Sequence, residues 1–257
     1  MKLTVKKNEY KHAVLAYLNQ WYELDRVHQV ALRAQTDRAE AGSAFRALAI
    51  AYSVIRGFGG GDGSKTERER RAAVKFRDVA RLVDAVPPLS DGSLAREAWT
   101  LAISIGKLFP RQSRKGPRAG TEIETTQLSA ATKFLWFAGH HNVRIFDTQA
   151  YAALYGMQRF GILTESVYCE FLAEWKRQYE LARDGLDEAI GAFDLHATLE
   201  WTVIPYETRD DVRDVLAKPW FRERVFDKYL WIKGARILNE IENARRERAS
   251  ARSRSKT

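Results

Sequence analysis

Apolar residues recur at three- and four-residue steps along most of this chain, the spacing of one face of an α-helix. From Tyr10 to about Arg33, for example, Val14, Leu18 and Val30 fall on this spacing. Further helices are predicted over residues 37–55, 66–86, 94–109, 129–138, 164–183, 185–195, 208–217 and 220–248, with a short extended piece at 201–206. No series of alternating apolar and polar residues accompanies them, so the predicted fold class is all-α or mainly α.

Capping residues and glycines mark the expected helix boundaries. Thr66, with Glu69 three residues later, matches a capping box, and Ser93 is a candidate N-cap for the helix at 94–109. Residues 57–63 are too rich in glycine to remain helical, and they lack the lysine spacing of a phosphate-binding loop. We interpret them as a hinge or loop, with a weak phosphate cradle as the alternative.

Composition indicates a globular chain, because 45% of its 257 residues are hydrophobic and 11% are aromatic. We assign residues 1–244 to a single helical domain, with two helical lobes and a cleft between them as the alternative. Residues 245–257 carry six Lys/Arg against one Glu and few apolar residues. We predict a disordered basic tail there, which either adds nonspecific affinity for nucleic acid or is simply solvated.

Several classes of protein are excluded. No apolar run approaches the roughly 20 residues of a membrane-spanning helix, and the N-terminal residues lack the pattern of a signal peptide. Cys169 is the only cysteine, which excludes a disulfide framework and a cysteine-ligated zinc or iron–sulfur site. We therefore expect a cytoplasmic protein with no membrane partner and no cofactor.

Positive charge makes nucleic acid a candidate partner, since the formal net charge is +9. Outside the tail, the stretch at 111–120 is basic and has no acidic residue. Its basic side chains are Arg111, Arg114, Lys115 and Arg118. Such a loop either contacts a DNA backbone or is a solvated connection.

Two ionisable residues near the middle of the chain are candidates for chemistry. Lys133 lies in the apolar helix at 129–138, where burial would lower the pKa of its amine and make it nucleophilic. Alternatively, its head group reaches solvent along its methylenes. Asp147 stands at the start of the next helix, where a carboxylate commonly caps exposed backbone N–H groups. Capping and catalysis are compatible, because a capping carboxylate can also face a cleft.

The residues SAATK at 129–133 and RIFDT at 144–148 resemble the catalytic core of the helix-hairpin-helix DNA glycosylases. The nearest branch is the bacterial group related to 8-oxoguanine DNA glycosylases, and FDKYLWIKG at 226–234 is similar to its closing helix. The resemblance implies a helical bundle of two packed subdomains. It also implies that Lys133 is the nucleophile and Asp147 the catalytic aspartate.

The sequence departs from this family just before the lysine. The family has a Gly-Val-Gly-like turn whose backbone N–H groups hold a phosphate, whereas residues 128–131 read LSAA. Ser129 and the N–H groups at the start of the helix remain as an alternative phosphate grip.

Residues around the lysine and the aspartate are expected to contact DNA or an extruded base. The DNA-contact candidates are Ser129, Thr132, His140, His141 and Arg144, together with the four basic residues of 111–120. The base-pocket candidates are Trp136, Trp99 and Phe58, and Arg56 is a weaker candidate for filling the gap in the duplex. Adjacent histidines diverge on a helix and no cysteine or carboxylate cluster accompanies them, so no metal is expected.

Family chemistry implies a DNA glycosylase that flips a modified base out of the duplex and cleaves its bond to deoxyribose. The target is an oxidised purine in repair, or a hypermodified base of viral DNA in antiviral defence. Either Lys133 attacks the sugar, which permits strand cleavage by an AP lyase step, or Asp147 directs a water and leaves an abasic site. Two other classes stay open, namely a noncatalytic helical nucleic-acid-binding module and a protein-interaction domain with a basic tail.

Overall fold

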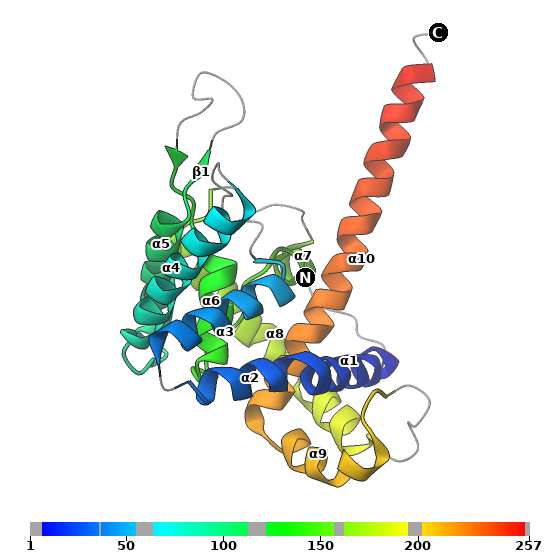
Figure 1. Ribbon diagram of the computed structural model, residues 1–257. Helices are drawn as coiled ribbons and strands as arrows, with labels where there is room; N and C mark the ends of the chain where they lie inside the picture. The colour runs from blue at the N-terminus through cyan, green and yellow to red at the C-terminus, as the bar shows by residue number, and fades with distance from the viewer. Residues whose placement is uncertain are drawn as a thin grey trace. The chain divides into compact units, whose positions relative to one another are not determined.

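The computed structural model describes residues 7–35, 37–54, 64–112, 122–156, 162–194 and 202–254. The described chain is all-helical apart from one pair of two-residue strands, as the apolar spacing predicts (Figure 1). Its elements are α1 (Lys7–Gln20), the π-helical turn η1 (Trp21–Asp25), α2 (Arg26–Arg33), α3 (Arg38–Ala51), α4 (Lys65–Asp84), α5 (Leu94–Leu108), β1 (Arg111–Gln112), β2 (Glu122–Ile123), α6 (Leu128–Phe137), α7 (Thr148–Tyr155), α8 (Glu165–Gly191), the 3₁₀ turn η4 (Tyr206–Thr208), α9 (Arg209–Leu216) and α10 (Pro219–Arg254). The two strands pair antiparallel.

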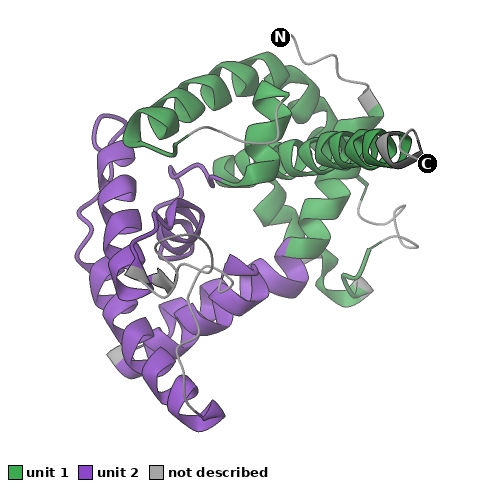
Figure 2. Ribbon diagram, turned by 90° about the horizontal axis from the view of Figure 1, so that it is seen from above, with its two compact units in different colours: residues 1–20, 147–257 green, residues 21–146 purple. Residues whose placement is uncertain are grey.

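The chain forms two compact units (Figure 2). Unit 1 comprises residues 1–20 and 147–257, and unit 2 comprises residues 21–146. The chain therefore passes from one unit to the other twice, after Gln20 and after Phe146.

Unit 1 is built around the contact of α7 with α10. A glycine permits this contact, because a Cβ at Gly234 would lie 1.8 Å from the carbonyl oxygen of Gln149. α1 and α8 also pack against α10, and the buried aromatic residues between them are Tyr17, Phe171, Trp175, Phe221 and Phe226. Burial of these rings supplies much of the hydrophobic stabilisation of the unit.

Unit 2 surrounds α6, a helix that is buried on nearly all sides. Such a helix belongs to the interior of a domain. α5 packs against it, and a Cβ at Gly106 of α5 would lie 1.8 Å from the Thr125 carbonyl oxygen. α3 and α4 pack against each other in the same unit. The fold thus places Lys133, which lies on α6, in the interior of unit 2.

Two helix boundaries differ from the prediction. The capping box of α4 lies two residues earlier than expected, with Ser64 and Glu67 exchanging hydrogen bonds. The predicted break near Gly185 is wrong, because α8 continues through it; the glycine instead lets the ring of Tyr10 approach, 2.8 Å from where a Cβ would stand. Of the extended piece predicted at 201–206, Trp201 lies outside the described residues and residue 206 begins η4.

The prediction of a disordered tail is wrong for residues 245–254, because α10 continues to Arg254 (Figure 1). Alanine, arginine and glutamate have high helix propensity. An ion pair one turn apart, between Arg246 Nε and Glu242 at 3.2 Å, adds to it. No helix of the described ranges is long and apolar enough to cross a membrane.

The first helical run has an unexpected polarity. The predicted apolar face included Val30, but its exposed fraction is 62%. The buried positions are instead Trp21, Asp25 and Gln29, one every four residues. In this part of the helix, the polar side chains of Asp25 and Gln29 are therefore buried.

Candidate active site

Lys133 lies in the interior of unit 2 and is only 7% exposed. Its Nζ donates a hydrogen bond to Ser129 Oγ, one helical turn earlier, at 2.8 Å. The alternative of a lysine that extends into solvent therefore does not describe this side chain. A buried amine is the kind of group that can act as a nucleophile.

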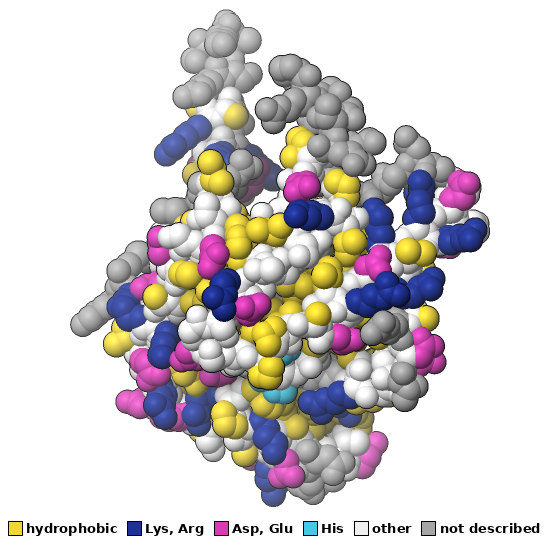
Figure 3. All heavy atoms as spheres, turned by 90° about the vertical axis from the view of Figure 1, so that its left-hand side faces the viewer, with side chains coloured by type: hydrophobic (Ala, Val, Ile, Leu, Met, Phe, Trp, Pro, Cys, Tyr) yellow, Lys and Arg dark blue, Asp and Glu magenta, His cyan; other side chains and the backbone are white. Residues whose placement is uncertain are grey.

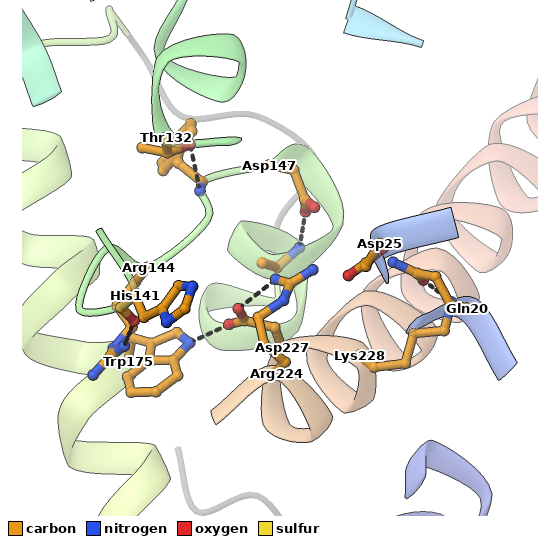
Figure 4. A network of polar contacts seen from close by, with 12 residues as sticks. Gln20, Asp25, Thr132, His141, Arg144, Asp147, Trp175, Arg224, Asp227 and Lys228 are labelled. Carbon is orange, nitrogen blue, oxygen red and sulfur yellow. Dashed lines mark hydrogen bonds and ion pairs between the residues drawn. The ribbon is translucent and has the colours of Figure 1, made fainter. Parts of the chain in front are cut away.

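Thr132, next to the lysine, connects the end of unit 2 to its core (Figure 4). Its hydroxyl donates to the Leu128 carbonyl oxygen at 2.9 Å and accepts the backbone N–H of Phe146 at 3.2 Å. The side chain is completely buried. The prediction that Thr132 contacts DNA is therefore wrong; its hydroxyl fixes the residue that precedes Asp147.

Asp147 is the N-cap of α7, as predicted (Figure 4). Its backbone is extended, and Oδ1 accepts the N–H of Ala150 at 2.6 Å. The residue is half-buried. The N-terminal end of a helix also stabilises a negative charge.

Lys133 and Asp147 belong to different units, since Asp147 is the first residue of the second segment of unit 1. They are connected through the backbone. Phe146 is held to Thr132 by its N–H, and Asp147 follows it directly.

The connector after α6 carries three of the DNA-contact candidates, all half-buried. Arg144 Nη1 donates to the His141 carbonyl oxygen at 3.3 Å, and the His141 ring lies 5.3 Å from the Trp136 ring. Burial lowers the pKa of His140, and burial with the nearby Arg33 lowers the pKa of His141. Both imidazoles are therefore protonated less readily than a solvent-exposed histidine.

Trp136 is not available to stack on a base, because it is 1% exposed and packs edge-on against Phe137 at 4.9 Å. That prediction is wrong, and the physical reason is the all-round burial of α6. Trp99 of α5 is half-buried. Ser129 is half-buried and accepts the Lys133 hydrogen bond.

The remaining candidates lie where the structure gives no side-chain description. Arg56, Phe58, Arg114, Lys115 and Arg118 lie outside the described residues, and Arg111 is described only as backbone of β1. On the face drawn in Figure 3, Lys/Arg and Asp/Glu side chains are interspersed, so the described part of that face is not continuously basic.

Sequence reasoning missed a buried polar cluster in unit 1 (Figure 4). Asp227 Oδ1 accepts the indole N–H of Trp175 at 2.7 Å, and Oδ2 accepts Arg224 Nη1 at 2.8 Å. Arg224 also lies 5.3 Å from the ring of Tyr17. The three-residue spacing of Arg224 and Asp227 could have suggested their pairing, but Trp175 is 52 residues away. With both carboxylate oxygens paired inside the fold, this cluster is structural.

Within the described ranges, no three or more His, Cys, Asp or Glu side chains gather in a way that could hold a metal ion. No protein-family model, curated protein or solved structure matches the chain.

Proposed function

We propose that this chain is a DNA glycosylase that excises a modified or damaged base. The observation that carries the proposal is the burial of the Lys133 amine in an apolar helix, where its Nζ donates to Ser129 Oγ. It is supported by Asp147, a half-buried carboxylate at a helix N-terminus, which follows a residue anchored beside that lysine. The resemblance of 129–133 and 144–148 to helix-hairpin-helix glycosylases implies that Lys133 is the nucleophile and Asp147 the catalytic aspartate.

The chemistry follows from these two groups. The base leaves C1′ of the deoxyribose with the electron pair of the glycosidic bond, and the Asp147 carboxylate stabilises the positive charge that develops on the sugar. The Lys133 amine then forms a bond to C1′, and the proton it loses neutralises the departing base. Ring opening gives a Schiff base, from which β-elimination nicks the strand. In the alternative step, Asp147 orients a water, which leaves an intact abasic site.

The partner is double-stranded DNA, and the enzyme is a monomer that acts in the cytoplasm, on the nucleoid or on invading DNA. The helical bundle of two packed subdomains expected for this family is part of the proposal. The two compact units support it.

Two substitutions test the assignments. Asp147→Asn keeps a good N-cap residue, because asparagine caps helices as well as aspartate; it should abolish base release while leaving DNA binding and folding intact. Asp78→Asn, which removes only an exposed ion pair with Arg81, is the matched control. Base release that persists in Asp147→Asn contradicts the role of the carboxylate.

Lys133→Gln tests the covalent route. Wild-type protein mixed with modified DNA and borohydride should give a trapped adduct, and the variant should give none. Lys107→Gln, at an exposed position of α5, controls for the loss of one positive charge. Base release without trapping in the wild-type protein would assign the reaction to the water route.

A second candidate function is a noncatalytic nucleic-acid-binding module. The observation that favours it is the C-terminal part of α10, where Arg245, Arg246 and Arg248 are all exposed. A basic helix of this kind binds phosphate backbones with strong salt dependence and no sequence preference. Binding without any base release would favour this function.

A further inference from the structure

The C-terminal part of α10 continues past the other helices of unit 1 as an exposed helix (Figure 1). Its residues 243–251 are all exposed, whereas Phe221, Val225 and Leu230, nearer the start of the same helix, are buried. The apolar residues of the exposed segment are three alanines. The segment therefore offers no apolar face to a protein core or to a lipid bilayer, so a partner must recognise its charges.

Two arginines of this segment lie on the face of α10 that contacts α7. The contact passes through Gly234, where a Cβ would lie 1.8 Å from the carbonyl oxygen of Gln149. Because an α-helix has about 3.6 residues per turn, Arg245 lies about three full turns further along the same face. Arg248, three residues later, shares this face, whereas Glu247 lies on the opposite side of the helix. The face that continues from the α7 contact is therefore positively charged.

The same helix fixes the distance between these arginines and Asp147. Asp147 caps α7 two residues before Gln149, so its carboxylate belongs to the end of α7 that meets α10 near Gly234. At a rise of about 1.5 Å per residue, Arg245 and Arg248 lie about 17 and 21 Å further along the axis of α10 than Gly234. All of these residues belong to unit 1. Within that unit, α10 is thus a continuous helical spacer between the carboxylate and the two arginines.

This spacing fits the phosphate backbone of duplex DNA. Successive phosphates of one strand are about 3.4 Å apart along the duplex axis, so the spacer corresponds to about five or six base pairs. Arginine is well suited to phosphate, because its guanidinium can donate two parallel hydrogen bonds. We propose that Arg245 and Arg248 bind the DNA backbone about five or six base pairs to one side of the nucleotide that faces Asp147. The assignment rests on the proposed glycosylase function, and it makes the contact of the protein with DNA one-sided.

Binding to duplexes that carry a tetrahydrofuran abasic-site analogue tests the assignment directly. The analogue has no base to release, so fluorescence anisotropy of the full-length protein measures binding without catalysis. The duplexes have about ten base pairs on both sides of the analogue, or about four on one side and ten on the other. We expect shortening of one flank to weaken binding by about tenfold or more, because it removes the phosphates that the arginines bind, and shortening of the other to weaken it less than about twofold. Equal losses on the two sides overturn the proposal.

Arg245→Gln/Arg248→Gln identifies the residues responsible. Glutamine is a good helix former, so circular dichroism should show an unchanged helix content. The variant should lose the difference between the two flanks, and the slope of log affinity against log salt should become shallower by about 1.8, about 0.9 for each phosphate contact. Arg177→Gln/Arg183→Gln is the matched control, because it removes two exposed arginines of α8 in the same unit and should change neither readout. An unchanged salt slope in the α10 variant contradicts the proposal.

Base release separates this inference from the proposed function. Equal dependence on the two flanks, in a protein that releases a modified base, overturns the assignment of Arg245 and Arg248 alone. One-sided dependence, in a protein that releases no base from any modified duplex, overturns the glycosylase function alone and leaves the backbone contact of α10 in place.

Discussion

Thr132→Val should disconnect the residue before Asp147 from the core of unit 2. Valine has the shape of threonine but lacks the hydroxyl, which accepts the Phe146 N–H at 3.2 Å. Both residues are buried, so the N–H would lose its partner with no water to replace it. Such a loss costs about 1–3 kcal/mol. Because Phe146 leads directly into Asp147, the substitution should also lower kcat more than it raises KM.

The size of this effect can be measured by thermal unfolding and by amide exchange. For a chain of this length, each kcal/mol lowers the melting temperature by about 2–4 °C. The Phe146 amide should exchange faster in Thr132→Val than in the wild type. Thr132→Ser is the matched control, since it keeps the hydroxyl and loses one methyl group, at a cost of about 1 kcal/mol. Equal exchange protection of Phe146 in the valine variant and the wild type would refute the role assigned to Thr132.

Two further predictions concern packing and pH. Gly234→Ala should strongly destabilise unit 1, because its Cβ would meet the Gln149 carbonyl oxygen at 1.8 Å, whereas Gly191→Ala meets nothing within 4 Å and should leave urea unfolding nearly unchanged. Burial lowers the pKa of His140 and His141 from the usual 6.5. The unfolded chain therefore binds more protons below about pH 6.5, so stability should fall as pH decreases from 7 to 5. His141→Asn should flatten this slope; an unchanged slope would contradict the burial of the ring.

Much of the fold follows from local patterns in the sequence. Apolar spacing predicts the helices, because burial of one face stabilises most helices in proteins. It also predicts the position of Asp147 at a helix start, where its carboxylate satisfies a backbone N–H. Apolar spacing likewise places Lys133 on an apolar helix. They cannot give its 7% exposure, which depends on the elements of unit 2 packed around α6.

The rest of the candidate site depends on contacts between distant residues. Trp136 looks like a stacking platform in the sequence, but it is buried because α6 has neighbours on nearly all sides. The pairing of Asp227 with Trp175 spans 52 residues and has no local signal. The burial of Asp25 and Gln29 also has no apolar signal, because apolar periodicity places Val30 on the interior face, where its exposed fraction is 62%.

Release of free base from modified DNA, read by mass spectrometry, decides whether this chain is a DNA glycosylase that depends on Asp147. Full-length protein is incubated with duplexes that contain oxidised purines or hypermodified pyrimidines, and the released bases are quantified against Asp147→Asn. We expect release of at least one modified base by the wild type and none by the variant. No release by the wild type from any duplex, or equal release by both proteins, would contradict it.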